Sequence, residues 1–298
     1  MANANAINPE TGKEYKSVKR SRFIGSIFAT AFFALLSAIL IYPLFCGFIA
    51  SFRPGRELIR RGLALNLDSS GMSLNNYKYL FSGNADSIKY WNWFKNSMIL
   101  TLVTVALTLI VCDFVAYGIT MYKFKLQTVL FMLVIATMMV PFEILLMPLY
   151  QEMIDINLID SMWGVILPGL CSASTIFFFH QYMISLPAEL LDAGRIDGAN
   201  EYYISVKIMM PITKPAFSSM AILCAMGAWN NMLWPLMVFR SADKFTLTIG
   251  LNTLLTPYGN NYDMLIAGSM LAIVPIMVVF LIFQRYIIDG MTAGAVKG

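Results

Sequence analysis

The sequence predicts an all-α, polytopic membrane protein with six transmembrane helices. Of its 298 residues, 58% are hydrophobic and only 13% are charged, whereas ordinary soluble domains carry about 25% charged residues. The hydrophobic residues gather in six separate runs, and a helix needs roughly 20 such residues to cross a bilayer. The composition therefore excludes an ordinary soluble domain, and the runs predict the number of spans.

The expected spans cover residues 23–52, 96–122, 126–150, 162–186, 215–239 and 264–284. Residues 1–22 are polar and are expected to form a flexible cytoplasmic segment, so the transmembrane domain is expected to cover 23–298. The first run is longer than a signal-peptide core of about 7–15 residues, so we expect it to remain as a membrane anchor. Pro141, Glu143 and Pro148 interrupt the third run, and the fourth holds the only histidine, His180.

The basic residues indicate which side of the membrane each loop faces, because cytoplasmic loops are enriched in Lys and Arg. Five basic residues precede the first span, and the loops after the second and fourth spans hold two and three, while the loop with Glu152, Asp155 and Asp160 holds none. The loop at about 53–95 opposes this pattern with seven, but longer loops determine topology more weakly. The sequence predicts a multi-pass protein of the cytoplasmic membrane, with both termini cytoplasmic and the 53–95 loop extracytoplasmic.

The cytoplasmic loop at about 187–211 is unusually polar for this chain and predicts a helix–turn–helix bracket. Pro187 suits the first turn of a helix at 188–196. Asp197-Gly198 is a turn pair in which Asp197 can cap the next helix. That second helix is expected at 201–210, and Pro211 is expected to end it.

The surface of this bracket has two interpretations. Tyr202, Tyr203 and Ile204 are expected to be exposed or half-exposed. Aromatic side chains on a charged surface suit the groove of a partner protein. They equally suit an interfacial amphipathic helix that touches lipid headgroups, and the residues alone leave both interpretations open.

The bracket resembles the EAA motif of ABC importer permeases, E-A-A-x-x-D-G-A-x8-I-x-L-P, which forms the coupling helix that docks on an ATPase subunit. Asp192 and Gly194 replace the first Glu and the second Ala, and Met210 replaces the Leu. The glycine is expected to cost the helix roughly 1 kcal/mol relative to alanine. The other motif positions match, namely Ala193, Asp197, Gly198, Ala199, Ile208 and Pro211.

Other segments resemble the MalG-like branch of carbohydrate permeases, in the same order and from about residue 23 to the end. They are SFRPGREL at 51–58, NNY at 75–77, NS at 96–97, AWNNMLWP at 228–235 and GMTAGAVKG at 290–298. The resemblance implies the fold of a type I ABC importer permease, and a permease subunit for a sugar or oligosaccharide.

The resemblance also implies the partners. They are a second homologous permease subunit, two copies of an ATPase subunit that bind ATP and Mg²⁺, and an extracytoplasmic solute-binding protein. This chain is expected to need membrane lipid and to hold no cofactor or metal of its own. The implied ATPase-docking residues are Leu190, Leu191, Asp192, Ala193, Gly194, Asp197, Gly198, Ala199, Tyr202, Tyr203 and Pro211.

The fifth span carries the residues expected to line a substrate path, Trp229, Asn230, Asn231 and Trp234. Amides donate to and accept from sugar hydroxyls, and an indole face packs on the C–H surface of a sugar ring. Helix-to-helix hydrogen bonds with an aromatic interface belt are the open alternative.

Two acids inside the spans are further candidates. Asp113 is expected either to bond another helix or to line the path, because charges in hydrocarbon face a partner or a cavity. Glu143 lies nearer a membrane boundary, so a structural or loop-anchoring role is favoured. Backbone groups freed by Pro141 could help satisfy it.

Several function classes are excluded or disfavoured. The chain has no G-x-x-x-x-G-K-[ST] phosphate loop and, with one histidine, no His-Glu-x-x-His site, so we expect no enzymatic activity. His180 is expected to make a headgroup-level or loop contact. The four cysteines lie in apolar runs without metal spacing and are expected to be small apolar filler. The net charge of +4 reflects topology rather than nucleic-acid binding.

Two alternatives from other classes remain. An ion-coupled secondary transporter usually shows an internal repeat and mid-membrane acids, and here only Asp113 fits. A non-transporting membrane scaffold could keep the cytoplasmic bracket but would not need the polar fifth span.

Overall fold

The structure is a computed structural model that describes residues 16–57, 71–82, 89–187, 189–256 and 259–293. The chain divides into two compact units, residues 1–76 and 77–298, and each is described by itself. Two short strands are the only non-helical elements in these ranges, which confirms the all-α class. Expectations for residues 1–15, for parts of the 53–95 loop and for the last five residues lie outside the described chain.

The first unit consists mainly of helix α1 (Lys16–Ala50), which contains Pro43. Its described side chains from Phe23 to Phe45 are all exposed in the single chain. After α1, the side-chain amide of Asn76 donates to the carbonyl oxygens of Ser51 and Arg53, both at 2.9 Å. These two hydrogen bonds hold Asn76 against the end of α1. The apolar surface of the helix requires a lipid or protein environment.

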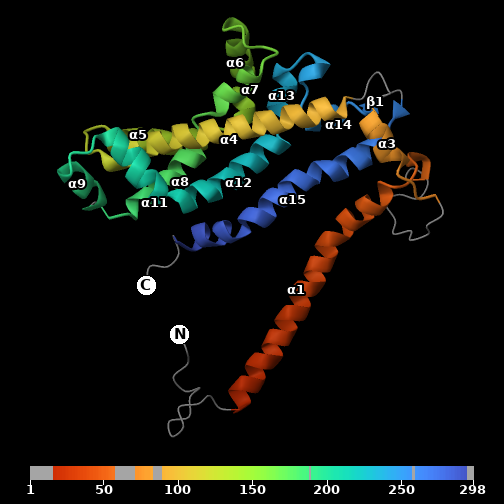
Figure 1. The fold of residues 1–298 in the computed structure, drawn as a ribbon, viewed down its shortest axis with the longest axis horizontal. Helices are drawn as coiled ribbons and strands as arrows, with labels where there is room; N and C mark the ends of the chain where they lie inside the picture. The colour runs from red at the N-terminus through yellow and green to blue at the C-terminus, as the bar shows by residue number, and fades with distance from the viewer. Residues whose placement is uncertain (1–15, 58–70, 83–88, 188, 257–258, 294–298) are drawn as a thin grey trace. The chain divides into compact units, whose positions relative to one another are not determined.

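Helix α4 (Tyr90–Met121) is the central element of the second unit. Helices α8 (Ala173–Ile184) and α12 (Lys214–Asn230) pack along α4, and α15 (Tyr262–Ala293) packs on α12 (Figure 1). Helix α5 (Gln127–Met138) packs on α8. Only about a third of the α4 span is buried by these contacts, so much of its apolar surface remains exposed in the single chain.

Within the described residues, the segments long and apolar enough to span a membrane number six when each bent pair of helices is taken as one span, which agrees with the predicted count. Three are single helices, within α1, α4 and α15, and three are pairs of helices joined at a bend. The first pair is α5 with α6 (Phe142–Asp155), bent by 101°. The second is α7 (Met162–Ile166) and η2 (Leu167–Gly169) with α8, bent by 44°. The third joins α10 (Glu201–Tyr203), η3 (Ile204–Met209) and α11 (Met210–Ile212) to α12 at 77°.

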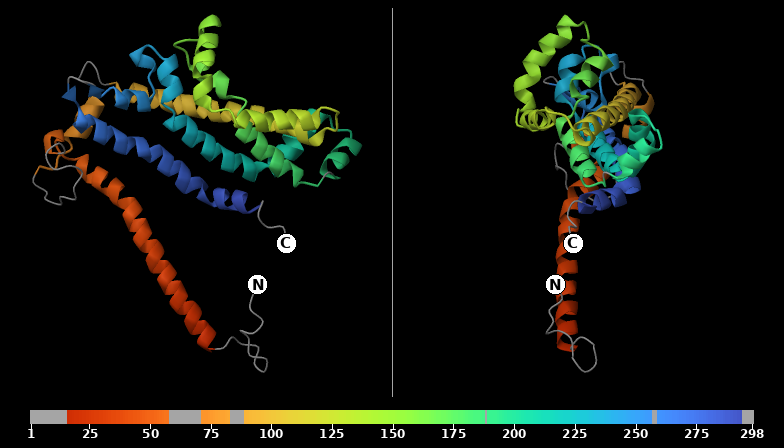
Figure 2. Two further views of the ribbon diagram at one scale, coloured as in Figure 1. Left: turned by 180° about the vertical axis from the view of Figure 1, so that it is seen from behind. Right: turned by 90° about the vertical axis from the view of Figure 1, so that its left-hand side faces the viewer.

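The break in the third span occurs where the sequence indicated. Pro141 is extended, with φ −60° and ψ 132°, and α6 begins directly after it. Glu143 lies in the first turn of α6, where the helix dipole favours a negative charge. Figures 1 and 2 show α6 and α7 with α13 (Leu233–Val238) on the side of α4 away from α15.

The fifth span differs from the prediction of one run at 215–239. Helix α12 ends at Asn230, Asn231 is extended with φ −66° and ψ 121°, and α13 starts at Leu233. Pro235 explains the break, because a continuous helix would need its missing N–H for the carbonyl of Asn231 and would force its ring against that carbonyl. The polar end of this span is therefore a kink, not a helix face.

One end of the bundle is closed by short elements. They are α3 (Asn75–Ser82), η4 (Ala242–Lys244), α14 (Leu247–Asn252) and the antiparallel strands β1 (Leu255–Thr256) and β2 (Gly259–Asn260), in which Leu255 pairs with Asn260. Helix α14 approaches α4 closely at Gly250, where a Cβ would lie 2.0 Å from the Trp93 ring. Only glycine allows this contact.

Asp160 joins the loop before α7 to the segment after α13. Its carboxylate accepts hydrogen bonds from the backbone N–H of Arg240 at 3.0 Å, from Ser241 Oγ at 2.6 Å and from Lys244 Nζ at 2.9 Å. Burial favours the neutral acid, but these bonds outweigh it and hold the pKa of Asp160 well below its usual range. The loop after the third span is thus tied to the segment that follows the fifth.

Candidate functional site

The predicted bracket forms at the end of the bundle opposite α14 (Figure 1). Its first helix is α9 (Glu189–Ile196). Leu191 and Gly194 are buried on one face of α9, Leu190 is half-buried, and Asp192 and Ala193 are exposed on the other face. The amphipathic pattern turns one face toward the membrane bundle and leaves the other free.

The turn after α9 requires glycine. Gly198 has φ +77°, a left-handed conformation that other residues rarely adopt. Its N–H donates to the Arg195 carbonyl at 3.1 Å, and the N–H of Ala199 donates to the Gly194 carbonyl at 3.0 Å. This pair of bonds is the Schellman arrangement that ends a helix.

The capping role expected of Asp197 is wrong. Asn200 caps the second helix, because its Oδ1 accepts from the N–H of Tyr203 at 2.8 Å. Asp197 instead occupies the last position of the α9 turn and is exposed. The left-handed Gly198 places Asn200, not Asp197, before the first helical residue.

Pro211 does not end the second helix, contrary to expectation. The chain passes through the π-helix η3 and continues as α11, which contains Pro211 in its first turn. A π-helical turn is wider than an α-turn and accommodates a proline ring and its missing N–H. The direction changes at Thr213 instead, whose hydroxyl bonds the Met209 carbonyl at 3.1 Å.

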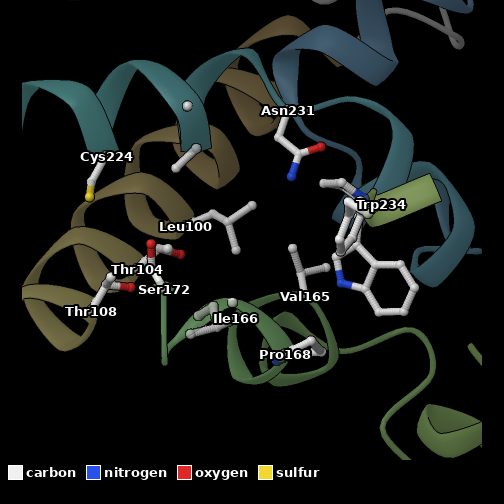
Figure 3. A pocket seen from close by; sticks show the side chains of 15 residues that line it. Leu100, Thr104, Thr108, Val165, Ile166, Pro168, Ser172, Cys224, Asn231 and Trp234 are labelled. Carbon is white, nitrogen blue, oxygen red and sulfur yellow. The ribbon is translucent and has the colours of Figure 1, made fainter. Parts of the chain in front are cut away.

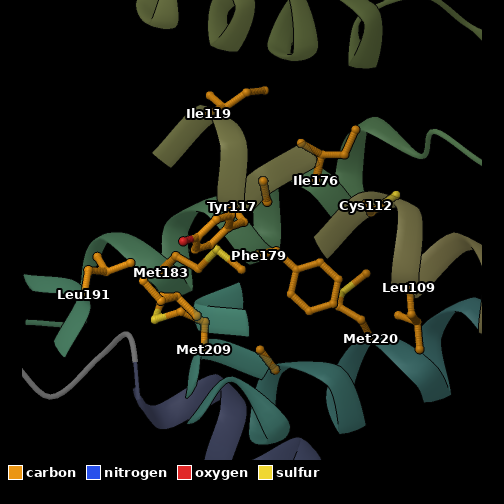
Figure 4. Close-up of a cluster of buried hydrophobic side chains, with 13 residues drawn as sticks. Leu109, Cys112, Tyr117, Ile119, Ile176, Phe179, Met183, Leu191, Met209 and Met220 are labelled. Atoms are coloured by element: carbon orange, nitrogen blue, oxygen red, sulfur yellow. The ribbon is translucent and has the colours of Figure 1, made fainter. Parts of the chain in front are cut away.

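The bracket is anchored in the largest hydrophobic core. Leu191, Ile204 and Met209 belong to a buried cluster that includes Tyr117 of α4 and Phe179 of α8 (Figure 4). Ile204 is 0% exposed, so the expectation that it is exposed or half-exposed is wrong.

Gly194 makes this burial possible. A Cβ at this position would lie 2.9 Å from Ile208 Cδ1 and 3.2 Å from Ile204 Cγ1. The glycine that was expected only to weaken the helix therefore allows α9 and η3 to pack closely.

Three residues that sequence reasoning missed hold the bracket in shape. Arg195 Nε donates to Glu201 Oε1 at 2.8 Å, and Tyr117 OH donates to Glu201 Oε2 at 2.9 Å. The hydrogen bond with Glu201 raises the pKa of the Arg195 guanidinium. The two bonds connect α9, α10 and α4. The opposite charges of Arg195 and Glu201, six positions apart, could have predicted their pairing from the sequence.

The outer surface of the bracket is available for a partner. Tyr202 is 70% exposed and Tyr203 is 53% exposed, as expected. The Tyr202 ring stacks on Phe114 with centroids 6.2 Å apart. A shallow depression is lined by Gly194, Asp197, Gly198, Ala199, Asn200, Tyr203 and Ile208.

A second site is a cavity of about 210 Å³ inside the bundle (Figure 3). Thr104, Thr108 and Ser172 lie at one end of it, and Asn231 and Trp234 lie at the other. Its remaining lining residues are Leu100, Phe142, Val165, Ile166, Pro168, Gly169, Cys224, Gly227, Ala228 and Pro235. The walls come from α4, α6, α7, η2 and α12, and from the kink between α12 and α13.

Only two of the four fifth-span candidates line this cavity, Asn231 and Trp234. Trp229 is buried elsewhere, where its Nε1 donates to the Ala272 carbonyl at 3.1 Å. Asn230 bonds its own helix at the Met226 carbonyl, at 2.9 Å. Trp229 therefore makes a helix-to-helix hydrogen bond, which was the open alternative, whereas Asn231 and Trp234 line the cavity.

The intramembrane acids and the histidine also lie away from the cavity lining. Asp113 is 1% exposed, and its Oδ1 has no hydrogen-bond partner in the described part of the chain. Glu143 is exposed on α6. His180 was expected to make a headgroup-level or loop contact. It is instead buried, with its ring centroid 3.7 Å from that of Phe131.

The threonines of the cavity were missed by sequence reasoning. Thr104 and Thr108 are four residues apart on α4, a spacing that places them on one helix face. That spacing was visible in the sequence, but the hollow opposite it depends on the kinks at η2 and Asn231.

Comparison with known proteins shows the family to which the chain belongs. The family model described as binding-protein-dependent transport system inner membrane component matches residues 114–292. The chain is 48% identical over 269 residues to the arabinooligosaccharides transport system permease protein AraQ of Bacillus subtilis (strain 168), covering 90% of this chain and 95% of that one. It is 36% identical to the lactose transport system permease protein LacG of Rhizobium radiobacter, covering 68% of this chain and 74% of that one.

The fold matches a solved structure of a bacterial ABC transporter involved in the import of the acidic polysaccharide alginate. The TM-score is 0.76 at 22% identity, over 90% of this chain and 98% of that chain. The fold match agrees with the family model and with the extent of the sequence identity. This chain belongs to the family of binding-protein-dependent transport system inner membrane components.

Proposed function

We propose that this chain is a permease subunit of an ABC importer that carries a sugar or oligosaccharide into a bacterial cell. It lies in the cytoplasmic membrane with both termini inside, so the bracket around Gly198 faces the cytoplasm. Relatives named for the transport of arabinooligosaccharides and lactose support the solute class. The observation that carries the proposal is the anchoring of an exposed bracket in the same helices that enclose a largely apolar cavity with a few polar side chains in its lining.

The bracket and the cavity share α4 and α12. Tyr117 of α4 bonds Glu201 of the bracket, and about two and a half to three and a half turns away α4 also carries Thr108 and Thr104 of the cavity. Helix α12 carries Met220 of the buried cluster and Cys224 of the cavity. Movement of the bracket is thereby transmitted through packed side chains to the cavity walls, since close-packed interiors transmit strain.

The energy source is a pair of ATPase subunits on separate chains, which bind ATP and Mg²⁺ and dock on the exposed face of the bracket. Tyr202 and Tyr203 supply the aromatic anchors of that interface. Closure of the two ATPase subunits moves the two brackets of the permease pair, and the spans alternate between outward and inward openings. This chain itself performs no catalysis.

Two further partners complete the importer. A second, homologous permease subunit faces the cavity side, and an extracytoplasmic solute-binding protein delivers the sugar. A groove lined by apolar parts of α4, α12 and α15, including Leu102, Val105 and Val278, provides surface for lipid or for the second permease.

An ion-coupled secondary transporter is the runner-up, and one observation favours it. The buried Oδ1 of Asp113 lacks a hydrogen-bond partner among the described residues, and such acids often bind coupling ions. Asp113 does not line the cavity, however. A non-transporting scaffold explains the bracket but not the cavity or the polar side chains in its lining.

Co-purification tests the proposal. The tagged chain is isolated from native membranes in mild detergent, and a second permease and an ATPase are expected in a ratio of about 1:1:2, as one permease pair with two coupling brackets requires. A photo-crosslinking residue at Tyr202 should capture the ATPase, whereas one at the exposed Trp91, at the other end of α4, should not. Elution as a single chain or homo-oligomer, without ATPase in the Tyr202 crosslink, would refute the proposal and favour the secondary transporter.

A further inference from the structure

The cavity beside α4 has a lining that restricts what it can hold. No charged side chain is present among the described residues that surround it. We propose that the cavity binds one uncharged sugar ring and that its neutral lining excludes anionic sugars from this subunit's side of the path. The inference rests on the proposed transport function and specifies the solute class.

The volume allows a single ring. The cavity measures about 210 Å³. A cavity of roughly 150 Å³ binds benzene, whereas pockets for larger organic ligands measure about 300–1,000 Å³. The volume within this subunit's part of the cavity therefore matches one sugar ring.

An unsatisfied hydroxyl points to a ligand with hydrogen-bonding groups. Thr108 is 3% exposed, and its Oγ1 has no partner among the residues that the structure describes. A buried polar group without a partner destabilises the folded protein. Thr104 lies one helical turn away on the same face, and Figure 3 shows both threonines at the same end of the cavity. A sugar hydroxyl both donates and accepts, so it can bond either side chain.

The hydroxyl of Ser172 at this end is already used. Its Oγ accepts from the backbone N–H of Thr175 at 3.4 Å and from Thr175 Oγ1 at 2.9 Å. It therefore holds the start of α8 in place, and Thr104 and Thr108 remain as the hydroxyls for a ligand.

The opposite end presents an oriented aromatic ring. Trp234 Nε1 donates to the Gly164 carbonyl at 3.2 Å, so its N–H is used within the protein and a ligand can contact only the ring. Sugar C–H groups pack on the faces of such rings. Asn231 points from the kink toward the space between the two ends (Figure 3), where its amide can bond a ring hydroxyl.

An anionic ring is disfavoured here on electrostatic grounds. An unpaired carboxylate in a low-dielectric interior is costly unless a positive charge or several donors compensate it. The lining offers hydroxyls, one amide and apolar groups, but no Lys or Arg within the described chain. A transporter of an acidic polysaccharide shares this fold, so the selectivity resides in the side chains and not in the fold.

A labelling experiment on the purified complex tests binding. Cys224 lines the cavity, and the exposed Cys171 does not. We expect methyl arabinoside or methyl galactoside to slow maleimide labelling of Cys224 several-fold and to leave Cys171 unchanged. The methyl glycoside of galacturonic acid, which differs from the galactoside by a carboxylate, should give no protection. Equal protection by the uronate, or no protection by any neutral glycoside, would overturn the inference.

Matched substitutions test the same site in transport. Thr108→Val keeps the side-chain shape and removes the hydroxyl, and we expect about a 5- to 10-fold fall in import of arabinotriose, lactose or galactotriose, since a net hydrogen bond contributes about 1 kcal/mol. Thr101→Val is the control, because Thr101 is also buried on α4 with an unpaired Oγ1 within the described chain, but faces the apolar groove. It should change import less than two-fold.

Different results would contradict the neutral-sugar inference and the proposed importer function. Equal effects of Thr108→Val and Thr101→Val, or import of trigalacturonate as fast as that of the best neutral sugar, would overturn the inference and leave the importer intact. Failure of the wild-type complex to import any of these sugars would refute the proposed function, and the inference with it.

Discussion

Replacement of Gly198 by valine isolates the backbone geometry of the bracket. Gly198 has φ +77°, and a Cβ at this position meets no atom within 4 Å. A Cβ is therefore accommodated within this chain, and the effect on the folding of the bracket itself comes from the left-handed backbone. That conformation costs an L-residue about 1–2 kcal/mol, and a β-branched residue is among the least tolerant of it.

The expected magnitude follows from the turn. The bonds from Gly198 to Arg195, at 3.1 Å, and from Ala199 to Gly194, at 3.0 Å, both depend on this conformation. A cost of about 1–2 kcal/mol lowers the ratio of native to non-native turn by a factor of roughly 5–30. We expect import to fall by up to this factor, while membrane insertion is unchanged because Gly198 is exposed and outside the spans.

The assay compares three quantities for Gly198→Val and wild type: the amount of chain in the membrane, the ATPase retained on purification, and the import rate. Gly198→Asn is the matched control, because asparagine is also found at left-handed helix ends, and it should keep most of the activity. Wild-type import by Gly198→Val, or an equal loss in both variants, would refute the reasoning. Indifference of transport to both substitutions is the result that a secondary transporter predicts.

Three other substitutions test separate contacts. Gly164→Ala places a Cβ 2.2 Å from the Leu158 carbonyl oxygen and should cost about 1–3 kcal/mol, seen as a lower melting temperature of the purified complex; Gly227→Ala, with nothing within 4 Å, should not lower it. Tyr117→Phe removes the bond to Glu201 at 2.9 Å and should lower import about 5-fold at an unchanged protein level, whereas wild-type import would dissociate this bond from coupling. The lowered pKa of Asp160 means that its stabilising contribution is present above the unfolded pKa of about 3.9 and is lost as pH falls through the folded value. Melting temperatures at pH 7 and pH 3 should therefore differ less for Asp160→Asn than for wild type, and an equal pH effect would contradict the assignment.

Local sequence was sufficient for the features that depend on near neighbours. The six apolar runs predicted the spans because each must satisfy its backbone within one helix in lipid. Pro141 predicted the break in the third span, and the Asp197-Gly198 pair predicted the turn of the bracket. In each case the cause lies within a few residues of its effect.

The wrong predictions for Pro211 and Ile204 have a common cause that does not lie in near neighbours. Pro211 was expected to end a helix, but the π-helical turn before it removes the conflict. Ile204 was expected at the surface, but Gly194, ten residues earlier, lets it pack against α9. Both outcomes depend on packing between elements rather than on the preference of the residue itself.

The sequence by itself determined the class of the protein, the number of its spans and the position of the bracket at about 187–211, because composition, helix length and glycine geometry are local properties. Only the tertiary structure decided which polar side chains face the cavity. Trp229 and Trp234 lie five residues apart, yet one bonds Ala272 in the core and the other forms a cavity wall. The kink between them at Asn231 changes the direction of the chain, and no helical periodicity extends across such a break.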